Sequence, residues 1–387
     1  MREQEWMHSR GAAPEQIDAG GCLASLMEQM EEGLSGRGRI PMLPSYLSTR
    51  IAVPGEAECL VMDAGGTNLR TARAVYRQGA WELRELEKTA MPGTEGELSF
   101  REFYGGLAAS LSRLGEARRV GMCFSYNVSM NRTLDGALDF WCKEVRVPEA
   151  VGRPVGASLR EALGEGCRAV HVLNDSVAAM LGAEDAQVGV ILGTGVNVCY
   201  CEPCDRIPKV PGDLRAGAMI LSTEVGEFDG FPRSAFEEAV IAASDAPDSA
   251  IAEKQCSGGY LGDIIAAVWR AAEADGLLEC CPAADLGSVS RLLQQQPETP
   301  AAKLAAIAVR RAAKIAAVLC AGPILRTGER HVRIAVEGSQ YWRLTGFREA
   351  FHRELDSLLP EGVTYEILQT ENACLIGAAR AAFAEPM

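Results

Sequence analysis

Two glycine-rich segments of this chain, residues 63–68 and 192–197, have the composition of phosphate-binding turns. Each follows an apolar, strand-like stretch, contains two glycines and a threonine, and ends on an asparagine. A glycine-rich turn between two strands points several backbone N–H groups at one spot, which holds a phosphate without a helix N-terminus. Two such turns facing each other predict a grip on the phosphate tail of one nucleotide. The residues expected at the phosphates are Gly65, Gly66, Thr67, Asn68, Gly193, Thr194 and Gly195.

The first segment taken alone is equally typical of an ordinary β-hairpin turn, in which glycine provides the positive φ. Its neighbours favour a functional interpretation. Asp63 stands at the strand end, and Mg²⁺ needs only one or two carboxylates besides water and phosphate oxygens. Arg70 lies two residues beyond the turn and can place positive charge against a phosphoryl group in transfer. We therefore expect Asp63 to bind Mg²⁺ through water and Arg70 to act in catalysis.

A third candidate is the pair Asn174 and Asp175, which follows a predicted strand and precedes a helix of small residues. Asn and Asp are common helix N-caps, so the pair taken alone is most simply a cap. In an open α/β lobe, however, ligands bind beyond the carboxyl ends of the strands. A hydroxyl that accepts a phosphoryl group needs one carboxylate to orient it and take its proton. Asp175 is our candidate for that base.

Several polar residues stand in otherwise apolar or small-residue surroundings. Lysine and glutamate are most often solvated surface residues, which is the simplest interpretation of each one alone. The alternative is sugar binding, because carboxylates and amides bond adjacent hydroxyls, and each charged hydrogen bond is worth about 1.5–3 kcal/mol. The residues are Ser129, Lys143, Asn197, Glu224 and Glu253.

The pattern of apolar residues predicts an α/β fold with two similar lobes, each a mixed sheet flanked by helices and carrying one glycine turn. Strand signals surround both turns, with a hairpin turn at residues 78–79 and further strands at 119–124, 169–173 and 332–336. The helix at residues 301–321 has the strongest signal. Further helices are expected at residues 17–33, 99–114, 156–164, 235–244, 259–274 and 345–358.

Composition limits the class of partner. The chain has 387 residues and a net charge of −14, with no block of basic residues, so we expect neither nucleic acid nor a membrane as partner. Residues 1–16 are expected to form a loose terminus and not a signal peptide, and thirteen scattered cysteines favour a reducing cytoplasm. Cys199, Cys201 and Cys204 lack a fourth metal ligand nearby. We expect ordinary thiols there, with a structural zinc as the alternative.

Taken in sequence order, these segments resemble the hexokinase family, which are two-lobed sugar kinases of the actin-like ATPase fold, a duplicated ribonuclease H-like fold. The resemblance covers most of the chain. Residues 60–70 (LVMDAGGTNLR) are similar to the first phosphate motif of the family, and residues 192–197 to the second. Residues 174–176 resemble the Asn-Asp-Thr motif that holds the catalytic base. The other similar segments are residues 42–46, 124–129, 141–143, 223–224, Glu253 with 257–262, and 336–339.

The resemblance implies ATP and Mg²⁺ in an interlobe cleft, with a hexose, glucose by default, deep against the hinge. Asp175 would take the proton from the sugar 6-hydroxyl, Lys143 would balance charge beside the sugar, and Arg70 would hold the phosphates. The implied sugar-binding residues are Ser129, Cys142, Lys143, Asn174, Asp175, Asn197, Glu224 and Glu253. Gly338 and Ser339 are expected on the adenosine side of the nucleotide.

The resemblance also implies a division into lobes. Residues 50–173, with a C-terminal helix at 372–387, would form the small lobe, and residues 174–371, with 17–49, the large lobe. The expected partners are the hexose and ATP, bound by a cytoplasmic monomer or homodimer.

Several positions depart from the family pattern. The departures are Asn127, Met130, Cys142, Ser222 and Glu337, together with the approach to the last helix at residues 372–377. The phosphate motifs and the candidate base are intact, which favours retained catalysis, whereas the changes around the sugar leave the hexose open. Two alternatives follow. One is a sugar-binding regulatory protein of the same fold with little turnover, and the other is a kinase for a modified hexose.

Overall fold

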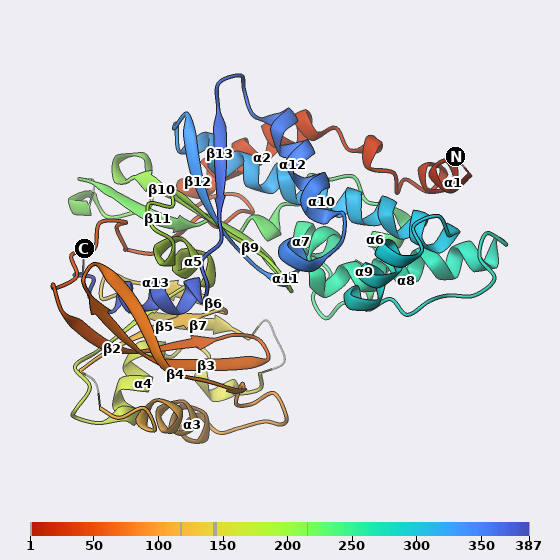
Figure 1. The fold of residues 1–387 in the computed structure, drawn as a ribbon. Coiled ribbons are helices and arrows are strands. Elements are labelled where there is room, and N and C mark those ends of the chain that lie inside the picture. The colour runs from red at the N-terminus through yellow and green to blue at the C-terminus, as the bar shows by residue number, and fades with distance from the viewer. Residues whose placement is uncertain (1, 117, 142–144, 215, 387) are drawn as a thin grey trace.

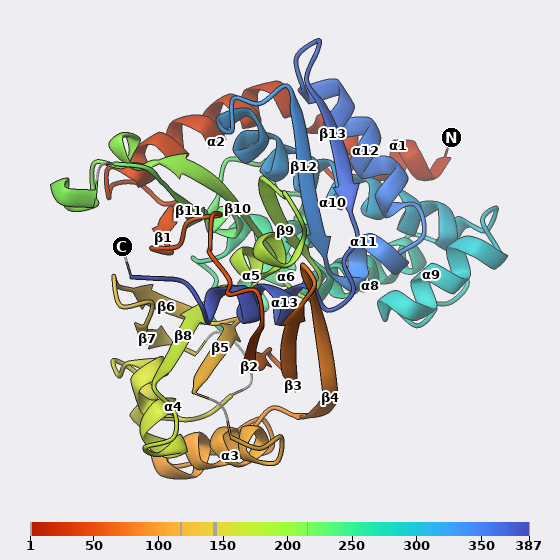
Figure 2. The ribbon, with the colours of Figure 1, turned by 60° about the vertical axis from the view of Figure 1, so that its left-hand side comes forward.

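The computed structural model describes residues 2–116, 118–141, 145–214 and 216–386. Two β-sheets dominate it, one of six strands and one of five, and helices α5 and α13 lie between them (Figures 1 and 2). Both sheets mix parallel and antiparallel pairing, so the predicted two-lobed α/β fold is confirmed. Within the described residues, no helix is both long and apolar enough to cross a bilayer.

The five-stranded sheet has the order β4-β3-β2-β5-β8. Strands β2, β3 and β4 form an antiparallel meander, and β5 and β8 add in parallel. Helices α3 (Phe100–Ser112) and α4 (Val155–Leu163) cover the face that points away from α5 and α13 (Figure 1). Helix α3 begins where it was predicted, because Ser99 and Glu102 form a capping box. The strands of this lobe are β2 (Ala57–Ala64), β3 (Asn68–Arg77), β4 (Ala80–Ala90), β5 (Arg119–Phe124), β8 (Ala169–Leu173) and a separate hairpin of β6 (Asn127–Met130) and β7 (Gly136–Phe140).

The six-stranded sheet has the order β1-β11-β10-β9-β12-β13. Strands β9, β12 and β13 run parallel, whereas β10, β11 and β1 add as antiparallel neighbours. Strands β9 and β10 form an antiparallel hairpin with a glycine turn, as β2 and β3 do in the other lobe. The strands are β1 (Leu43–Pro44), β9 (Val188–Leu192), β10 (Val196–Pro203), β11 (Ala218–Ser222), β12 (His331–Glu337) and β13 (Thr364–Leu368).

Helix α10 (Pro300–Arg326) forms the centre of the large lobe. Thr299 caps it and Pro300 occupies its first turn, where the missing N–H costs nothing. Most of its alanine-rich surface is buried, because α2, α8 and α12 pack around it. The other helices are α2 (Ala19–Leu34), α5 (Asp175–Gly182), α6 (Ala235–Ala243), α7 (Ile251–Cys256), α8 (Gly258–Ala274), α9 (Leu286–Gln295), α11 (Ser339–Arg343), α12 (Phe347–Leu358) and α13 (Ala373–Ala381).

Helices α5 and α13 cross between the sheets with their backbones in contact (Figure 2). A Cβ atom at Gly377 would lie 1.9 Å from the carbonyl oxygen of Ala178, and one at Gly182 would lie 2.0 Å from that of Ala373. Only glycine permits so close an approach. The small residues of these two segments therefore bring the lobes together at one joint.

The N-terminal residues are docked, so the expectation of a loose terminus is wrong. Residues 2–9 form helix α1 (Arg2–Ser9), and Trp6 stacks on Phe236 with ring centroids 5.8 Å apart. The Trp6 indole N–H donates to Asp275 at 2.9 Å, and the Arg10 guanidinium lies 4.0 Å from the Trp6 ring centroid. An eight-residue helix has too few turns to show a periodic apolar pattern, which is why its sequence gave no signal.

Candidate active site

Three polar side chains from β10, β11 and the turn after β11 form one hydrogen-bonded cluster. Asn197 Nδ2 donates to Glu224 Oε1 at 2.7 Å and to Ser222 Oγ at 2.9 Å. The Ser222 hydroxyl donates to Glu224 Oε1 at 2.7 Å, and the Glu224 amide donates to Asn197 Oδ1 at 3.0 Å. Antiparallel pairing of β10 with β11 brings these positions together. The structure thus unites two predicted sugar ligands, Asn197 and Glu224, and adds Ser222 between them.

Glu224 is held in an unfavourable backbone conformation. Its φ is +58°, in the left-handed region, which costs a non-glycine residue about 1–3 kcal/mol and persists only where the surroundings fix it. Burial raises the pKa of its carboxyl, and the nearby negative charge of Asp175 acts in the same direction, whereas the hydrogen bonds from Ser222 and Asn197 oppose them. Such a strained, partly desolvated carboxylate is typical of a binding site.

Asn174 and Asp175 occupy different positions at the start of α5: Asn174 is the N-cap, and Asp175 is the first helical residue. Asn174 Oδ1 accepts from the Ser176 amide at 2.8 Å, so the N-cap interpretation is confirmed for this residue. Its Oδ1 also lies 3.5 Å from Asn197 Nδ2, next to the cluster. Asp175 occupies the first turn of α5, where the helix dipole favours its negative charge. Asp175 and Glu224 are neighbours, and the role of Asp175 as a base stays a prediction.

A mostly apolar pocket lies between the lobes beside this cluster. The large lobe contributes Asn174, Ser222 and Glu224, and the small lobe contributes aromatic and aliphatic side chains from β5, β6 and the turn between them. Three of the positions that depart from the family pattern line it, namely Asn127, Met130 and Ser222. The complete lining is Leu43, Pro44, Ser45, Phe124, Tyr126, Asn127, Val128, Met130, Val172, Leu173, Asn174, Val177, Ser222 and Glu224.

The first glycine turn joins β2 to β3 as predicted. The Gly65 amide donates to the Asn68 carbonyl at 3.0 Å, and the Tyr126 hydroxyl donates to the Gly65 carbonyl at 2.8 Å. Thr67 and Asn68 are exposed at its tip, while Gly66 is half-buried. Tyr126, which the sequence offered only as part of a segment, therefore fixes the turn to the pocket wall.

Asp63 and Arg70 stand opposite each other in the β2–β3 ladder and form an ion pair. Arg70 Nε donates to Asp63 Oδ2 at 2.9 Å, and Arg70 Nη1 donates to Asn372 Oδ1 at 3.4 Å at the start of α13. Glu337 lies close by: burial raises the pKa of its carboxyl, which the charge of Arg70 lowers and that of Asp63 raises. Asp63, predicted to bind magnesium, and Arg70, predicted to bind the phosphates, thus lie side by side, and Arg70 also contacts the start of α13.

The second glycine turn joins β9 to β10 and packs against two other segments, at Gly338 and at Gly258. Gly338, with φ +124°, lies so close that a Cβ on it would be 2.1 Å from the Leu192 carbonyl oxygen. A Cβ on Gly193 would lie 3.4 Å from the Gly338 Cα. Ser339 follows as the first residue of α11, and Thr194 is exposed at the tip. The segment expected on the adenosine side and the second glycine turn are therefore adjacent.

Ser129, a predicted sugar ligand, is not brought into this group. Ser129 is exposed on β6 and its hydroxyl donates to Asp139 at 2.8 Å, away from the described pocket lining. Cys142 and Lys143 lie outside the described residues. The structure thus brings Asn174, Asn197 and Glu224 together, with Asp175 next to Asn174 in the chain. Glu253 lies on α7, where its Oε2 accepts from the Val196 amide at 3.0 Å.

The cysteines of the C-x-C-x₂-C segment lie along β10 and just after it. Burial raises the pKa of all three thiols, that of Cys201 to about 11. Metal ions bind the thiolate, so this environment favours neutral thiols. Over the described residues, no group of three or more histidine, cysteine or acidic side chains is placed to hold a metal ion.

Comparison with known proteins identifies relatives of this chain by sequence. Two family models described as hexokinase match the chain, one over residues 21–184 and one over residues 187–280 and 289–384. Hexokinase-7 of Oryza sativa subsp. japonica is 31% identical over 270 residues, covering 63% of this chain and 58% of that protein. Hexokinase-like 1 protein of Arabidopsis thaliana is 31% identical over 293 residues, covering 68% and 57%. The matched region thus spans little more than half the length of these relatives.

Solved structures agree in fold. The structure titled hexokinase from Schistosoma mansoni complexed with glucose has a TM-score of 0.82 at 22% identity, covering 98% of this chain and 99% of that chain. A ROK family glucokinase from Streptomyces griseus in complex with glucose and AMPPNP has a TM-score of 0.52 at 18% identity, covering 84% and 98%. These likenesses confirm the sugar-kinase type of actin-like ATPase fold. Because the two family models together account for most of its length, the chain belongs to the hexokinase family.

Proposed function

We propose that the protein transfers the γ-phosphoryl group of ATP to the 6-hydroxyl of a hexose, with glucose as the first candidate. The position of Asp175 supports this most strongly. This residue directly follows Asn174, which lines the pocket between the lobes, and its negative charge acts on Glu224 of the Asn197–Ser222–Glu224 cluster. A base for one hydroxyl and partners for the neighbouring hydroxyls are therefore in one place.

In this proposal the chain's own residues bind, orient and deprotonate the sugar. Glu224 accepts from sugar hydroxyls, and Asn197, which is already fixed by Glu224, keeps that carboxylate in place. Asp175 takes the proton from the 6-hydroxyl, and the Ser176 amide, which donates to Asp175 Oδ1 at 2.9 Å, orients its carboxylate. Closure of the lobes over the pocket excludes water, so the sugar and not solvent is phosphorylated.

The residues of the two turns fit MgATP. Both turns are glycine-rich, join two strands, and expose a threonine at the tip, and Gly338 lies close against the second one. Bound MgATP supplies the phosphoryl group. We propose that Asp63 holds the magnesium ion through water while Arg70, anchored by Asp63, directs its positive charge at the phosphates.

A second candidate is a kinase for a modified hexose, such as an amino or N-acetyl sugar. The observation that favours it is the lining of the pocket, where Asn127, Met130 and Ser222 replace residues usual in the family. These changes alter the shape and polarity of the sugar site and leave Asp175 and both turns intact. They bear on which sugar is used and not on the reaction.

The test is an ADP-release assay with MgATP and a panel of glucose, fructose, mannose, glucosamine and N-acetyl hexoses. We expect hexose-dependent ADP formation, fastest with glucose. Faster turnover of an amino or N-acetyl sugar would select the second candidate. No turnover with any sugar, together with a sugar-induced change in tryptophan fluorescence, would replace both proposals by a sugar-binding protein without kinase activity.

A further inference from the structure

The side chain of Lys209, in the loop between β10 and β11, ends among three backbone carbonyls. Its ammonium donates to the Gly33 carbonyl at 2.8 Å. It also donates to the carbonyls of Pro41 and Met42, each at 2.5 Å. Because an ammonium has three N–H donors, these contacts satisfy all of them. Lys209 therefore joins the C-terminal end of α2 to the chain segment that leads into β1.

The end of α2 is shaped to receive that segment. The Leu34 carbonyl accepts from the Lys209 amide at 3.3 Å, so this residue caps the helix with both its backbone and its side chain. A Cβ on Gly33 would lie 2.1 Å from the Ile40 carbonyl oxygen and 2.7 Å from Met42 Cγ. Glycine therefore lets the segment pass close to the helix end, where a positive charge is favourable.

The residues directly after this junction form one wall of the interlobe pocket. Leu43, Pro44 and Ser45 all belong to the pocket lining. Strand β1 pairs with β11 so that Leu43 stands opposite Ser222, whose hydroxyl donates to Glu224. The position of β1 therefore sets the shape of the pocket beside the Asn197–Ser222–Glu224 cluster.

Strand β1 has only two residues, so its position depends on the contacts of its neighbours. On one side the Met42 amide donates to the Thr223 carbonyl at 3.2 Å, and the Ser45 amide donates to the Ile220 carbonyl at 3.1 Å. Met42 has a φ of +50°, which a non-glycine residue keeps only where its surroundings fix it. Its carbonyl is fixed by Lys209, on the side away from β11.

We propose that Lys209 is a positioning residue for the hexose, because its ammonium holds residues 41–45 against β11 and thereby fixes the pocket wall beside Ser222 and Glu224. This inference rests on the proposed kinase function for the identity of the ligand. The pocket lining that the structure describes does not include Lys209, which acts through the segment and does not touch the sugar. Its loss should weaken sugar binding and leave the transfer step of bound sugar nearly unchanged.

The charge of Lys209 gives this role a dependence on pH. Burial lowers the pKa of the ammonium to about 8, and the groups that face it, from α2 and from the segment after it, are uncharged carbonyls. A neutral amine has two N–H donors for three carbonyls, and its lone pair opposes the third. We therefore expect the pocket wall to loosen as the pH rises through the lowered pKa.

The test measures glucose binding to the full-length protein by tryptophan fluorescence. Lys209→Met keeps much of the apolar stem and removes the donors, so it is expected to raise the glucose Kd about ten-fold at about pH 7. The kcat at saturating glucose should stay within about two-fold of wild type. Between about pH 7 and pH 9 the wild-type Kd should rise toward that of Lys209→Met, whose Kd should be high throughout. Lys209→Arg stays charged over this range, so its Kd should not rise.

Lys314→Met is the matched control. Lys314 is also largely buried, pairs with Glu354 at 3.5 Å between α10 and α12, and lies outside the described pocket lining. Its loss should leave the glucose Kd near the wild-type value. A Kd of Lys209→Met within about two-fold of wild type, a lowered kcat with an unchanged Kd, or an equal loss of affinity in Lys314→Met would overturn the proposal.

Two further measurements keep the proposal testable if the first variant or the kinase function fails. If Lys209→Met does not fold, a wild-type Kd that rises with pH while that of Lys209→Arg stays level supports the proposal, and parallel profiles overturn it. Failure of the kinase function would appear as absent hexose-dependent ADP formation in the wild type. Hydrogen exchange of the amides at residues 40–47 then tests the contact itself. Exchange should be faster in Lys209→Met than in wild type and Lys314→Met, and equal rates in all three would overturn the proposal.

Discussion

Arg132 of the small lobe and Asp213 of the large lobe form a two-pronged ion pair, with 2.7 Å between Nη1 and Oδ2 and 2.6 Å between Nη2 and Oδ1. Arg132 comes two residues after Met130, which lines the interlobe pocket, and Asp213 lies in the loop between β10 and β11. Both side chains are exposed. The pair therefore joins the lobes at the surface, two residues along the chain from the interlobe pocket.

Breaking this pair is expected to speed the loss of bound sugar. Arg132→Ala or Asp213→Ala should raise the hexose dissociation rate by at most about five-fold, because exposed pairs are weak and screened by salt. The double charge swap, Arg132→Asp with Asp213→Arg, should restore much of the wild-type rate. Stopped-flow tryptophan fluorescence measures the rate, and an effect of equal size at about 1 M salt would contradict an ionic contact.

Removing the candidate base should stop chemistry and spare binding. Asp175→Ala is expected to lower kcat about 100-fold or more, since a positioned general base contributes at least that much. Glucose binding followed by fluorescence and the melting temperature should stay near the wild-type values. Near wild-type turnover in this variant would exclude Asp175 as the base.

The affinity for the sugar should depend on pH through Glu224. Burial raises the pKa of this carboxyl above its ordinary value of 4.5, so it takes up a proton at a pH where an exposed glutamate stays ionised. Once protonated, it is a poorer acceptor for Asn197 and for sugar hydroxyls, and the sugar KM should rise as the pH falls toward the raised pKa. Glu224→Gln should have a high KM at every pH and lack this rise. A wild-type KM that stays flat down to about pH 4.5 would contradict the assignment.

Ser129 is expected to be dispensable, although the sequence placed it among the sugar ligands. Its hydroxyl bonds Asp139 on the exposed side of the β6–β7 hairpin. Ser129→Ala should therefore change the sugar KM by less than about two-fold, in keeping with an exposed substitution. A large increase in the sugar KM without a change in melting temperature would show that Ser129 does contact the sugar.

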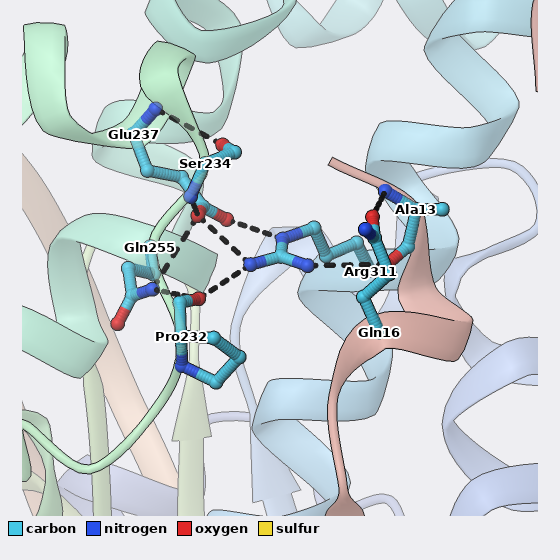
Figure 3. A network of polar contacts seen from close by, with 7 residues as sticks. All are labelled: Ala13, Gln16, Pro232, Ser234, Glu237, Gln255 and Arg311. Atoms are coloured by element: carbon cyan, nitrogen blue, oxygen red, sulfur yellow. Dashed lines mark hydrogen bonds and ion pairs between the residues drawn. The ribbon is translucent and has the colours of Figure 1, made fainter. Parts of the chain in front are cut away.

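The buried ion pair between Arg311 and Glu237 (Figure 3) should be important for stability. Arg311→Met leaves the Glu237 carboxylate buried without its charged partner, which costs about 3–5 kcal/mol in comparable pairs. Denaturant unfolding measures the loss. Lys303→Met, which breaks the exposed pair with Glu298, is the matched control and should change stability little. Similar losses in both variants would mean that the burial of the Arg311 pair is not the cause.

Local chemistry made much of the fold predictable. Strands β5 and β8 occupy residues 119–124 and 169–173, as predicted, because each is a short apolar run bounded by turn residues. Helix α10 was predicted from its long alanine-rich pattern and extends several residues further at its C-terminal end. The helices that were not predicted, α1, α7, α9 and α11, are short and depend on tertiary packing for their formation.

The site was predictable as a set of residues but not as a geometry. The motifs named Asn174, Asp175, Asn197 and Glu224, and the fold brings them together. Whether a strand residue points to a pocket or to solvent depends on register, and a shift by one residue reverses it. Val128 is buried and Ser129 exposed because β6 pairs with β7 in one register. Likewise, no sequence pattern showed that Glu253 would meet the Val196 amide, since that contact is set by how α7 packs.

The crossing of α5 and α13 limits how the length of this chain can change. One residue inserted early in α13 would turn the rest of the helix by about 100° and carry a side chain to the place where Gly377 meets Ala178. The candidate base Asp175 begins the partner helix, so the same insertion would displace it from the Asn197–Ser222–Glu224 cluster. Insertions are tolerable in the outer loops of either lobe, whereas at this joint the chain can vary only by substitution on the faces that do not touch.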